Sequence, residues 1–280
     1  MNNFFTRILS GIGLIAISLL LVFSGPWGLL IFAAIVLVFG LWEWNKLLTE
    51  ENNLVVLISL LSGLVLLLTS FYILNFIVLL AILGFFTLGV FLVDKKRWKP
   101  FLFGQFYISI PLIFLQLIPY NYTFLDFSLS QKIQLYNPYL PFMLFVLVWS
   151  SDSWAYVFGK LFGKHKMAPN ISPGKTWEGF IGGTIMTAIS GYLYCLLVLT
   201  PESSQYYGNG YHNFSVEKAV ILGLFVSIFG TLGDLFESSL KRKAKVKDSG
   251  NVIPGHGGIL DRYDALLFVI LVQFVISYLW

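Results

Sequence analysis

Acidic, hydroxyl and basic side chains recur on one side of an apolar stretch late in this sequence. Asp234, Ser238 and Lys241 follow one another at steps of four and three residues, in and just after the apolar range 216–240. This spacing places them on one face of a helix. Ionisable side chains at membrane depth are costly and mark functional sites. We therefore expect this face to point into the protein or into a wet cavity.

More aspartates follow in the segment 243–264. Asp248 lies in a glycine-rich loop, and Asp261 and Asp264 lie one helical turn apart where the last apolar range opens. Oxygen ligands without cysteine favour a hard cation such as Mg²⁺. We predict Asp234 and Asp261 as metal ligands, Asp248 as a third ligand or a neighbour of the ligands, and Asp264 as a supporting residue. The alternative is that these aspartates only pair with neighbouring lysines and arginines.

Basic residues and glycines surround these aspartates. Cationic side chains and glycine amides both bind phosphate oxygens, so together with a metal they indicate a nucleotide or pyrophosphate site. Phosphate contacts are predicted for Lys241, Arg242, Lys247 and Arg262. Lys243 and Lys245 fit a solvated loop better. His256, between two glycines, is either a catalyst or a residue that stabilises the turn.

A second polar cluster lies between the apolar ranges 138–158 and 177–199. The run Pro173-Gly174-Lys175-Thr176 is only superficially similar to a P-loop, because the preceding strand and the earlier glycine are absent. Ser172-Pro173 by itself favours a cap at a helix entry. Candidates for nucleotide contacts are Lys175, Ser172, Asp152 and Ser238. Asp152 either supports the metal or pairs with a loop lysine.

The composition requires most of the chain to face lipid. Hydrophobic residues make up 57% of the 280 residues, charged residues 11%, and the mean hydropathy is +0.80. A soluble domain has about 25% charged residues, so this chain cannot cover a water-facing surface. We predict a single membrane domain over 1–280. Cys195 is the one cysteine, which excludes an intrachain disulfide and the common zinc sites.

Apolar runs long enough to cross a membrane predict an all-α protein with about nine spans. The ranges are 5–24, 26–45, 54–74, 76–93, 101–119, 138–158, 177–199, 216–240 and 263–280. The third and fourth come from one long run, broken near Asn75. A hairpin over 5–45 that re-enters the same face would change the count. We expect 5–24 to be an uncleaved first span, since no small-residue cleavage site follows it.

The basic residues predict the orientation. With nine spans and a cytoplasmic N-terminus, 16 of the 18 lysines and arginines fall on the cytoplasmic side, all but Lys132 and Lys218. Short loops obey this bias, so the active site is expected to face the cytoplasm. The charge of +4 then describes one face of a membrane protein and not a nucleic-acid-binding surface. Helices in 1–137 are expected to form a scaffold, and those in 138–280 to carry the active site.

The segment Ser238 to Asp264 carries a family resemblance. It reads SSLKRKAKVKDSGNVIPGHGGILDRYD and resembles the signature of bacterial phosphatidate cytidylyltransferases (CDP-diglyceride synthases). That signature is S-x-x-K-R, four residues, K-D-x-G, then P-G-H-G-G-x-x-D-R-x-D, and every fixed element matches. Tyr263 is the one departure, where an aliphatic residue is more usual. The motif-level match covers about residues 150–265, and the first 140 residues are similar in hydropathy alone.

The resemblance implies a reaction in which CTP and phosphatidic acid give CDP-diacylglycerol and pyrophosphate. It also implies a nine-span homodimer in the bacterial inner membrane, in contact with membrane lipid. A polar cavity facing the cytoplasm would hold Mg²⁺, with a second, monovalent cation such as K⁺. The metal carboxylates of the family would fall on Asp234 and Asp261.

Two other functions compete with this interpretation. A CTP-dependent lipid kinase, for example for a polyprenol, would share the nucleotide site but release CDP. A transporter of anionic metabolites would place the polar cluster near the membrane midplane between repeated, broken helices. The polar residues instead gather at one predicted face, and no repeat of the two halves is detected, which disfavours transport.

Overall fold

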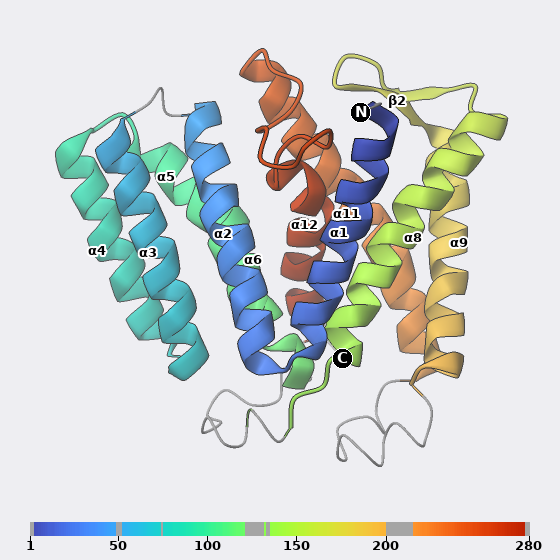
Figure 1. Ribbon diagram of the computed structural model, residues 1–280, viewed down its shortest axis with the longest axis horizontal. Helices are drawn as coiled ribbons and strands as arrows, with labels where there is room; N and C mark the ends of the chain where they lie inside the picture. Colours follow the sequence, from blue (N-terminus) through green and yellow to red (C-terminus); the bar gives the residue numbers. More distant parts are fainter. Residues whose placement is uncertain are drawn as a thin grey trace.

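The computed structural model is a bundle of long, roughly aligned helices (Figure 1). The structure describes residues 3–48, 52–73, 75–120, 132, 135–199 and 215–277. Two peripheral helices, α3 and α4, lie at one side of the bundle, and α9 lies at the opposite side. The loop that precedes α12 and a short β-hairpin lie at the same end of the molecule.

Helices lie at each of the predicted apolar ranges that the structure describes. In chain order they are α1 (Asn3–Phe23), α2 (Pro26–Leu48), α3 (Asn53–Tyr72), α4 (Phe76–Val93), the segmented rod α5 (Trp98–Gly104), η1 (Gln105–Ser109) and α6 (Ile110–Leu115), then α8 (Tyr139–Phe162), α9 (Trp177–Leu197), α11 (Val216–Lys243) and α12 (Leu260–Ser277). The break predicted near Asn75 is confirmed, because the Asn75 side chain accepts hydrogen bonds from the amides of Ile77 and Val78 and so begins α4.

Six of the described helices are long and apolar enough to cross a membrane. They are Pro26–Leu48, Asn53–Tyr72, Trp98–Tyr120, Tyr139–Phe162, Trp177–Leu197 and Val216–Lys243. Shorter apolar helices cover Leu9–Phe23 and Ile77–Val93. The chain is therefore a mostly helical integral membrane protein. The nine-span count stays a prediction.

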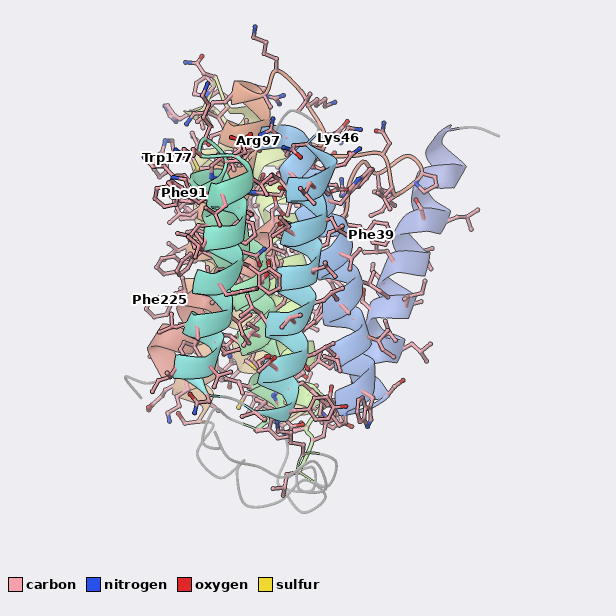
Figure 2. All side chains as sticks on the ribbon, turned by 90° about the vertical axis from the view of Figure 1, so that its left-hand side faces the viewer. Phe39, Lys46, Phe91, Arg97, Trp177 and Phe225 are labelled. Carbon is pink, nitrogen blue, oxygen red and sulfur yellow. The ribbon has the colours of Figure 1, made fainter. Side chains whose placement is uncertain are left out.

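Charged and apolar side chains separate along the bundle. Phe39 and Phe91 are exposed on the sides of α2 and α4, whereas Lys46 and Arg97 lie at one end (Figure 2). Lys132 belongs to the opposite end, where its ammonium donates to the carbonyl of Phe71 in the last turn of α3. The described helices thus place these cations at the two ends that the topology prediction assigns them.

Small residues let α8, α9 and α11 approach closely. A Cβ added at Gly179 of α9 would lie 2.6 Å from the carbonyl oxygen of Ala155 in α8, and one at Gly223 of α11 would lie 2.6 Å from that of Thr187 in α9. The hydroxyl of Ser227 lies 3.1 Å from Ser151 and 2.9 Å from Thr184, so it joins the three helices. Small residues and interhelical hydroxyls are the usual means of packing helices in lipid.

The all-α prediction needs one addition, a two-stranded antiparallel hairpin. Its strands are β1 (Lys166–Ala168) and β2 (Ser172–Thr176), between α8 and α9. Ser172 therefore lies in a strand, and the prediction that Ser172-Pro173 caps a helix is wrong. Thr176 is the cap instead, since its hydroxyl accepts a hydrogen bond from the amide of Gly179.

Gly223→Ala tests the close packing of α9 and α11. The added methyl group must push the helices apart, and overpacking of this kind costs on the order of 1–3 kcal/mol. The thermal unfolding midpoint of the purified protein in detergent should fall. Gly89→Ala in α4 is the matched control, because nothing lies within 4 Å of a Cβ there; it should leave the midpoint unchanged or raise it. Equal midpoints for the two variants would contradict this packing.

Candidate active site

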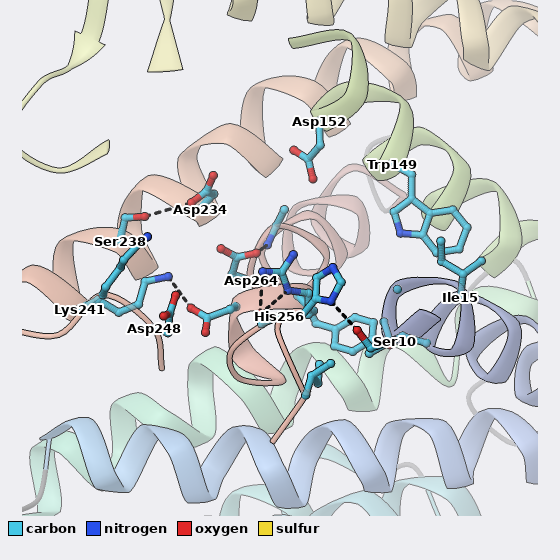
Figure 3. A pocket seen from close by; sticks show the side chains of 18 of the residues that line it. Ser10, Ile15, Trp149, Asp152, Asp234, Ser238, Lys241, Asp248, His256 and Asp264 are labelled. Atoms are coloured by element: carbon cyan, nitrogen blue, oxygen red, sulfur yellow. Dashed lines mark hydrogen bonds and ion pairs between the residues drawn. The ribbon is translucent and has the colours of Figure 1, made fainter. Parts of the chain in front are cut away.

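A polar pocket of about 510 Å³ lies between α1, α8, α11, α12 and the loop before α12 (Figure 3). Eleven of the thirteen predicted site residues line it: Asp152, Asp234, Ser238, Lys241, Arg242, Lys247, Asp248, His256, Asp261, Arg262 and Asp264. The N-terminal half adds a wall from α1, formed by Ser10, Gly11, Leu14 and Ile15. The pocket therefore combines residues that lie more than 200 positions apart in the sequence.

The polar face of α11 points into this pocket, as its spacing predicts. Asp234 forms an ion pair with Lys175, 2.7 Å between Oδ2 and Nζ. Its other oxygen accepts a hydrogen bond of 3.1 Å from the hydroxyl of Ser238, one turn further along α11. Lys175 does not belong to the pocket wall, but this ion pair connects the hairpin to the wall.

Lys241 is the central cation of the site. Its ammonium forms ion pairs with Glu237 of the same helix and with Oδ1 of Asp261 in α12, the latter at 2.6 Å. The Glu237 side chain is 0% exposed and the Lys241 side chain 10%. A buried charge is tolerated only when an opposite charge or hydrogen-bond donors compensate it. One lysine therefore balances two buried carboxylates and joins α11 to α12.

Asp261 is also bound by the backbone of the loop. Its Oδ2 accepts hydrogen bonds from the amides of Ser249 at 2.9 Å and Gly258 at 2.8 Å. The carboxylate lies in the first turn of α12, where the helix dipole favours a negative charge. Gly257 has a φ of 84°, and a Cβ there would lie 2.8 Å from Asp261 Oδ2 and 3.3 Å from Asp248 Cβ. Only glycine fits between these two aspartates.

The donor chemistry of the pocket fits a hard cation. Five aspartates line it: Asp152, Asp234, Asp248, Asp261 and Asp264. The carboxylate of Asp234 lies within electrostatic range of those of Asp152 and Asp264. In the described ranges no three His, Cys, Asp or Glu residues are close enough to form a ready-made metal centre. Lys175 forms an ion pair with Asp234, and Lys241 forms one with Asp261. These are the pairs expected if the aspartates only bind neighbouring basic residues. The two lysines thus occupy carboxylate oxygens that a bound cation would use.

The hairpin contacts the site without lining it. Arg242 donates from Nε to the carbonyl of Ile171 at 3.2 Å and from Nη1 to that of Val246 at 3.0 Å. It thereby connects the hairpin turn with the loop after α11. Ser172 is not among the residues that line the pocket, so its predicted nucleotide contact has no support from this geometry.

His256 packs against the first helix. Its Nδ1 lies 2.7 Å from the hydroxyl of Ser10 in α1, and that hydroxyl also donates to the carbonyl of Pro254 at 3.0 Å. Arg262 donates from Nε and Nη2 to the carbonyl of His256 at 3.1 and 2.8 Å. These contacts hold the Pro-Gly-His-Gly turn between α1 and α12. They favour the turn-stabilising interpretation of His256 over the catalytic one.

Glu43 of α2 contacts the site loop, a role that the sequence interpretation missed. Between Trp42 and Trp44 it suggests an anchor at the membrane interface, but its side chain is 0% exposed. Its carboxylate accepts hydrogen bonds from the amides of Ile259 and Leu260 and from the hydroxyl of Ser249. The one signal in the sequence is a carboxylate inside an apolar run, which marks a functional residue by default.

The fold and the site define a membrane-embedded helical protein with a pocket of aspartates, lysines and arginines at one end. Residues 5–280 match the cytidylyltransferase family, and the chain belongs to it. The phosphatidate cytidylyltransferase of Bacillus subtilis (strain 168) is 48% identical over 124 residues, 44% of this chain and 42% of that protein.

Two staphylococcal proteins of the same name are similar to a comparable extent. That of Staphylococcus aureus (strain COL) is 48% identical over 128 residues, 45% of this chain and 44% of that protein. That of Staphylococcus haemolyticus (strain JCSC1435) is 46% identical over 126 residues, 45% of this chain and 44% of that protein. The matched segment thus spans less than half the length of each of these relatives.

Lys241→Met tests the buried ion pairs. Removal of one partner of a buried pair costs about 3–5 kcal/mol, because it leaves a charge without compensation. The unfolding midpoint in detergent should fall markedly, and adding Glu237→Gln should restore part of it. Lys243→Met, at an exposed position in the same turn, should leave the midpoint near that of the wild type. A single variant at Lys241 as stable as the wild type would refute the central role of this lysine.

Proposed function

We propose that this protein transfers CMP from CTP to phosphatidic acid, giving CDP-diacylglycerol and pyrophosphate. The observation that carries the proposal is the pocket at one end of the bundle, where five aspartates lie among Lys241, Arg242, Lys247 and Arg262. Membership of the cytidylyltransferase family and the names of the bacterial relatives support the same reaction.

The pocket has the polarity that both substrates need. We assign the phosphates of CTP and of the lipid to four residues, because cationic side chains form strong hydrogen bonds with phosphate oxygens. The four line the pocket: Lys241, Arg242, Lys247 and Arg262. Lys175 would also bind phosphate once its ion pair with Asp234 is broken. Leu14, Ile15 and Trp149 form an apolar wall of the same pocket, and we assign this wall to the diacylglycerol part of phosphatidic acid.

The chemical step is an in-line displacement at phosphorus. A phosphate oxygen of phosphatidic acid attacks the α-phosphorus of CTP, the bond to the β-phosphate breaks, and pyrophosphate leaves with the bonding electrons. Phosphomonoesters have a second pKa of about 6, so the nucleophile is already an anion and needs no strong general base. The lysines and arginines reduce the repulsion between the two anions and stabilise the pyrophosphate.

We assign the proposed Mg²⁺ to Asp234 and Asp261, with Asp248 as a third ligand or a neighbour. When bound there, the ion would polarise the phosphoryl oxygens and neutralise the charge that develops on the leaving group. Asp152 and Asp264 line the same pocket and would support these ligands or a second, monovalent cation such as K⁺. Ser238 holds Asp234 in place through its hydrogen bond.

We also propose the topology and location of the protein. Nine spans with a cytoplasmic N-terminus would put the pocket at the cytoplasmic face of a bacterial inner membrane, where CTP is available. The positive-inside bias of the loops supports this orientation, and the bacterial relatives support the location. A homodimer completes the proposal, and chemical cross-linking of the protein in its native membrane tests it.

Product analysis tests the reaction directly. Detergent-purified protein would be incubated with radiolabelled CTP, phosphatidic acid and Mg²⁺, and both lipid and aqueous products would be separated. The proposal predicts a labelled CDP-lipid and one pyrophosphate for each lipid formed. Release of CDP with a phosphorylated lipid would identify a kinase instead, and an absence of any labelled lipid would reject the proposed reaction.

Asp261→Asn should remove most of the turnover while the protein remains inserted and folded, because Lys241 keeps its ion pair with Glu237. The loss of a metal carboxylate should lower the rate by about 100-fold or more, because metal coordination contributes several kcal/mol of charge stabilisation. The measurement is the rate of CDP-diacylglycerol formation by purified protein. Lys243→Ala, at an exposed position, is the matched control and should be mild. Near-normal synthesis by Asp261→Asn would show that the metal assignment is wrong.

A further inference from the structure

We propose that Glu43 of α2 is a positioning residue for the metal and nucleotide site, acting through the loop 248–260. The inference rests on the proposed function. Glu43 lies in the helices expected to act as a scaffold, yet its carboxylate contacts both ends of this loop. Oε2 accepts from the hydroxyl of Ser249 and the amide of Leu260, both at 2.8 Å, and Oε1 accepts from the amide of Ile259 at 2.9 Å.

The contacts of Glu43 lie next to those of Asp261 along the same backbone. The amide of Gly258 donates to Asp261, and the next two amides donate to Glu43. Ser249 connects the two carboxylates, because its amide donates to Asp261 and its hydroxyl to Glu43. A shift of Glu43 would therefore displace the residues that carry, or directly follow, the amides that orient Asp261.

A carboxylate is needed at this position. In the described ranges Glu43 forms no salt bridge, and its buried charge is balanced by two amides at the N-terminus of α12 and by one hydroxyl. Helix N-termini stabilise negative charge through their free amides and the helix dipole. Glutamine has one acceptor oxygen, so its NH₂ group would face an amide or hydroxyl donor that the carboxylate now binds.

The loop glycines fit around the Glu43 side chain. A Cβ added at Gly250 would lie 2.5 Å from Oε1, 2.8 Å from Cδ and 3.0 Å from Cγ of Glu43, with no other residue among its closest contacts. A Cβ at Gly258 would also meet both oxygens of Glu43. Gly250→Ala therefore disturbs the same contact from the loop side without changing the residue at position 43.

Glu43→Gln is the primary test. Loss of a residue that orients metal ligands typically costs 10- to 100-fold in metal affinity or activity. We expect the Mg²⁺ concentration for half-maximal activity to rise about 10- to 100-fold, with the KM for phosphatidic acid unchanged. Trypsin should also cleave faster after the exposed Lys245 and Lys247, because the loop has lost its anchor. Glu217→Gln removes an exposed carboxylate at the far end of α11 and should match the wild type in every measurement.

A double-mutant cycle tests the contact from both sides. Gly250→Ala alone should reproduce the defect, and the shorter side chain of Glu43→Asp combined with it should recover part of the Mg²⁺ affinity lost by Gly250→Ala. If Glu43→Gln cannot be recovered folded, Gly250→Ala provides the same readouts. Wild-type kinetics and wild-type cleavage in Glu43→Gln would overturn the inference. So would an equal loss in all kinetic constants together with a lowered unfolding midpoint, because that pattern indicates a general structural role.

The test separates this inference from the proposed reaction. If the wild-type protein forms no CDP-lipid, the proposed reaction fails. In that case two measurements still report on the loop. One is the rate of trypsin cleavage, and the other is Mn²⁺ binding, measured from the electron paramagnetic resonance signal of the free ion. Faster cleavage and weaker Mn²⁺ binding in Glu43→Gln would then support the positioning role, and unchanged values would overturn it.

Discussion

The arrangement of the pocket depends on one buried cation. Lys241 pairs with Glu237 of its own helix and with Asp261 of the next, so a single ammonium joins the C-terminal end of α11 to the N-terminal end of α12. Charges out of water are stable only when an opposite charge or hydrogen-bond donors compensate them. The loop between the two helices is thereby restrained at both ends, and its aspartate, Asp248, lines the pocket.

The same principle explains how the site can be both stable and reactive. Asp234 and Asp261 each form an ion pair with a lysine, which balances their charge within the protein. In the proposed reaction these lysines are also the groups that bind phosphate, so Asp234 and Asp261 would each exchange a lysine for a metal ion and keep their own charge balanced. The ion pairs are therefore part of the proposed mechanism.

Local patterns in the sequence predicted the helices and much of the pocket. Hydropathy placed the apolar helices within a few residues, and the four-and-three spacing on α11 correctly directed Asp234 into a cavity. Ser172 was misjudged because strands as short as β1 and β2 have no alternating apolar pattern to detect. Glu43 was missed because its partners lie more than 200 residues away. Contacts of that length depend on tertiary packing, which spacing along the chain does not reveal.

The proposed mechanism requires Asp234 and Asp261, from two different helices, to bind one divalent cation or an adjacent pair of cations in this pocket. An experimental structure of the protein with CTP and Mn²⁺, in which the anomalous signal locates the ion, tests it most directly. We expect an Mn²⁺ peak within coordination distance of both carboxylates, with Lys175 and Lys241 turned toward the phosphates. A structure in which the Lys175–Asp234 and Lys241–Asp261 ion pairs are intact and the ion lies outside the pocket would contradict this assignment.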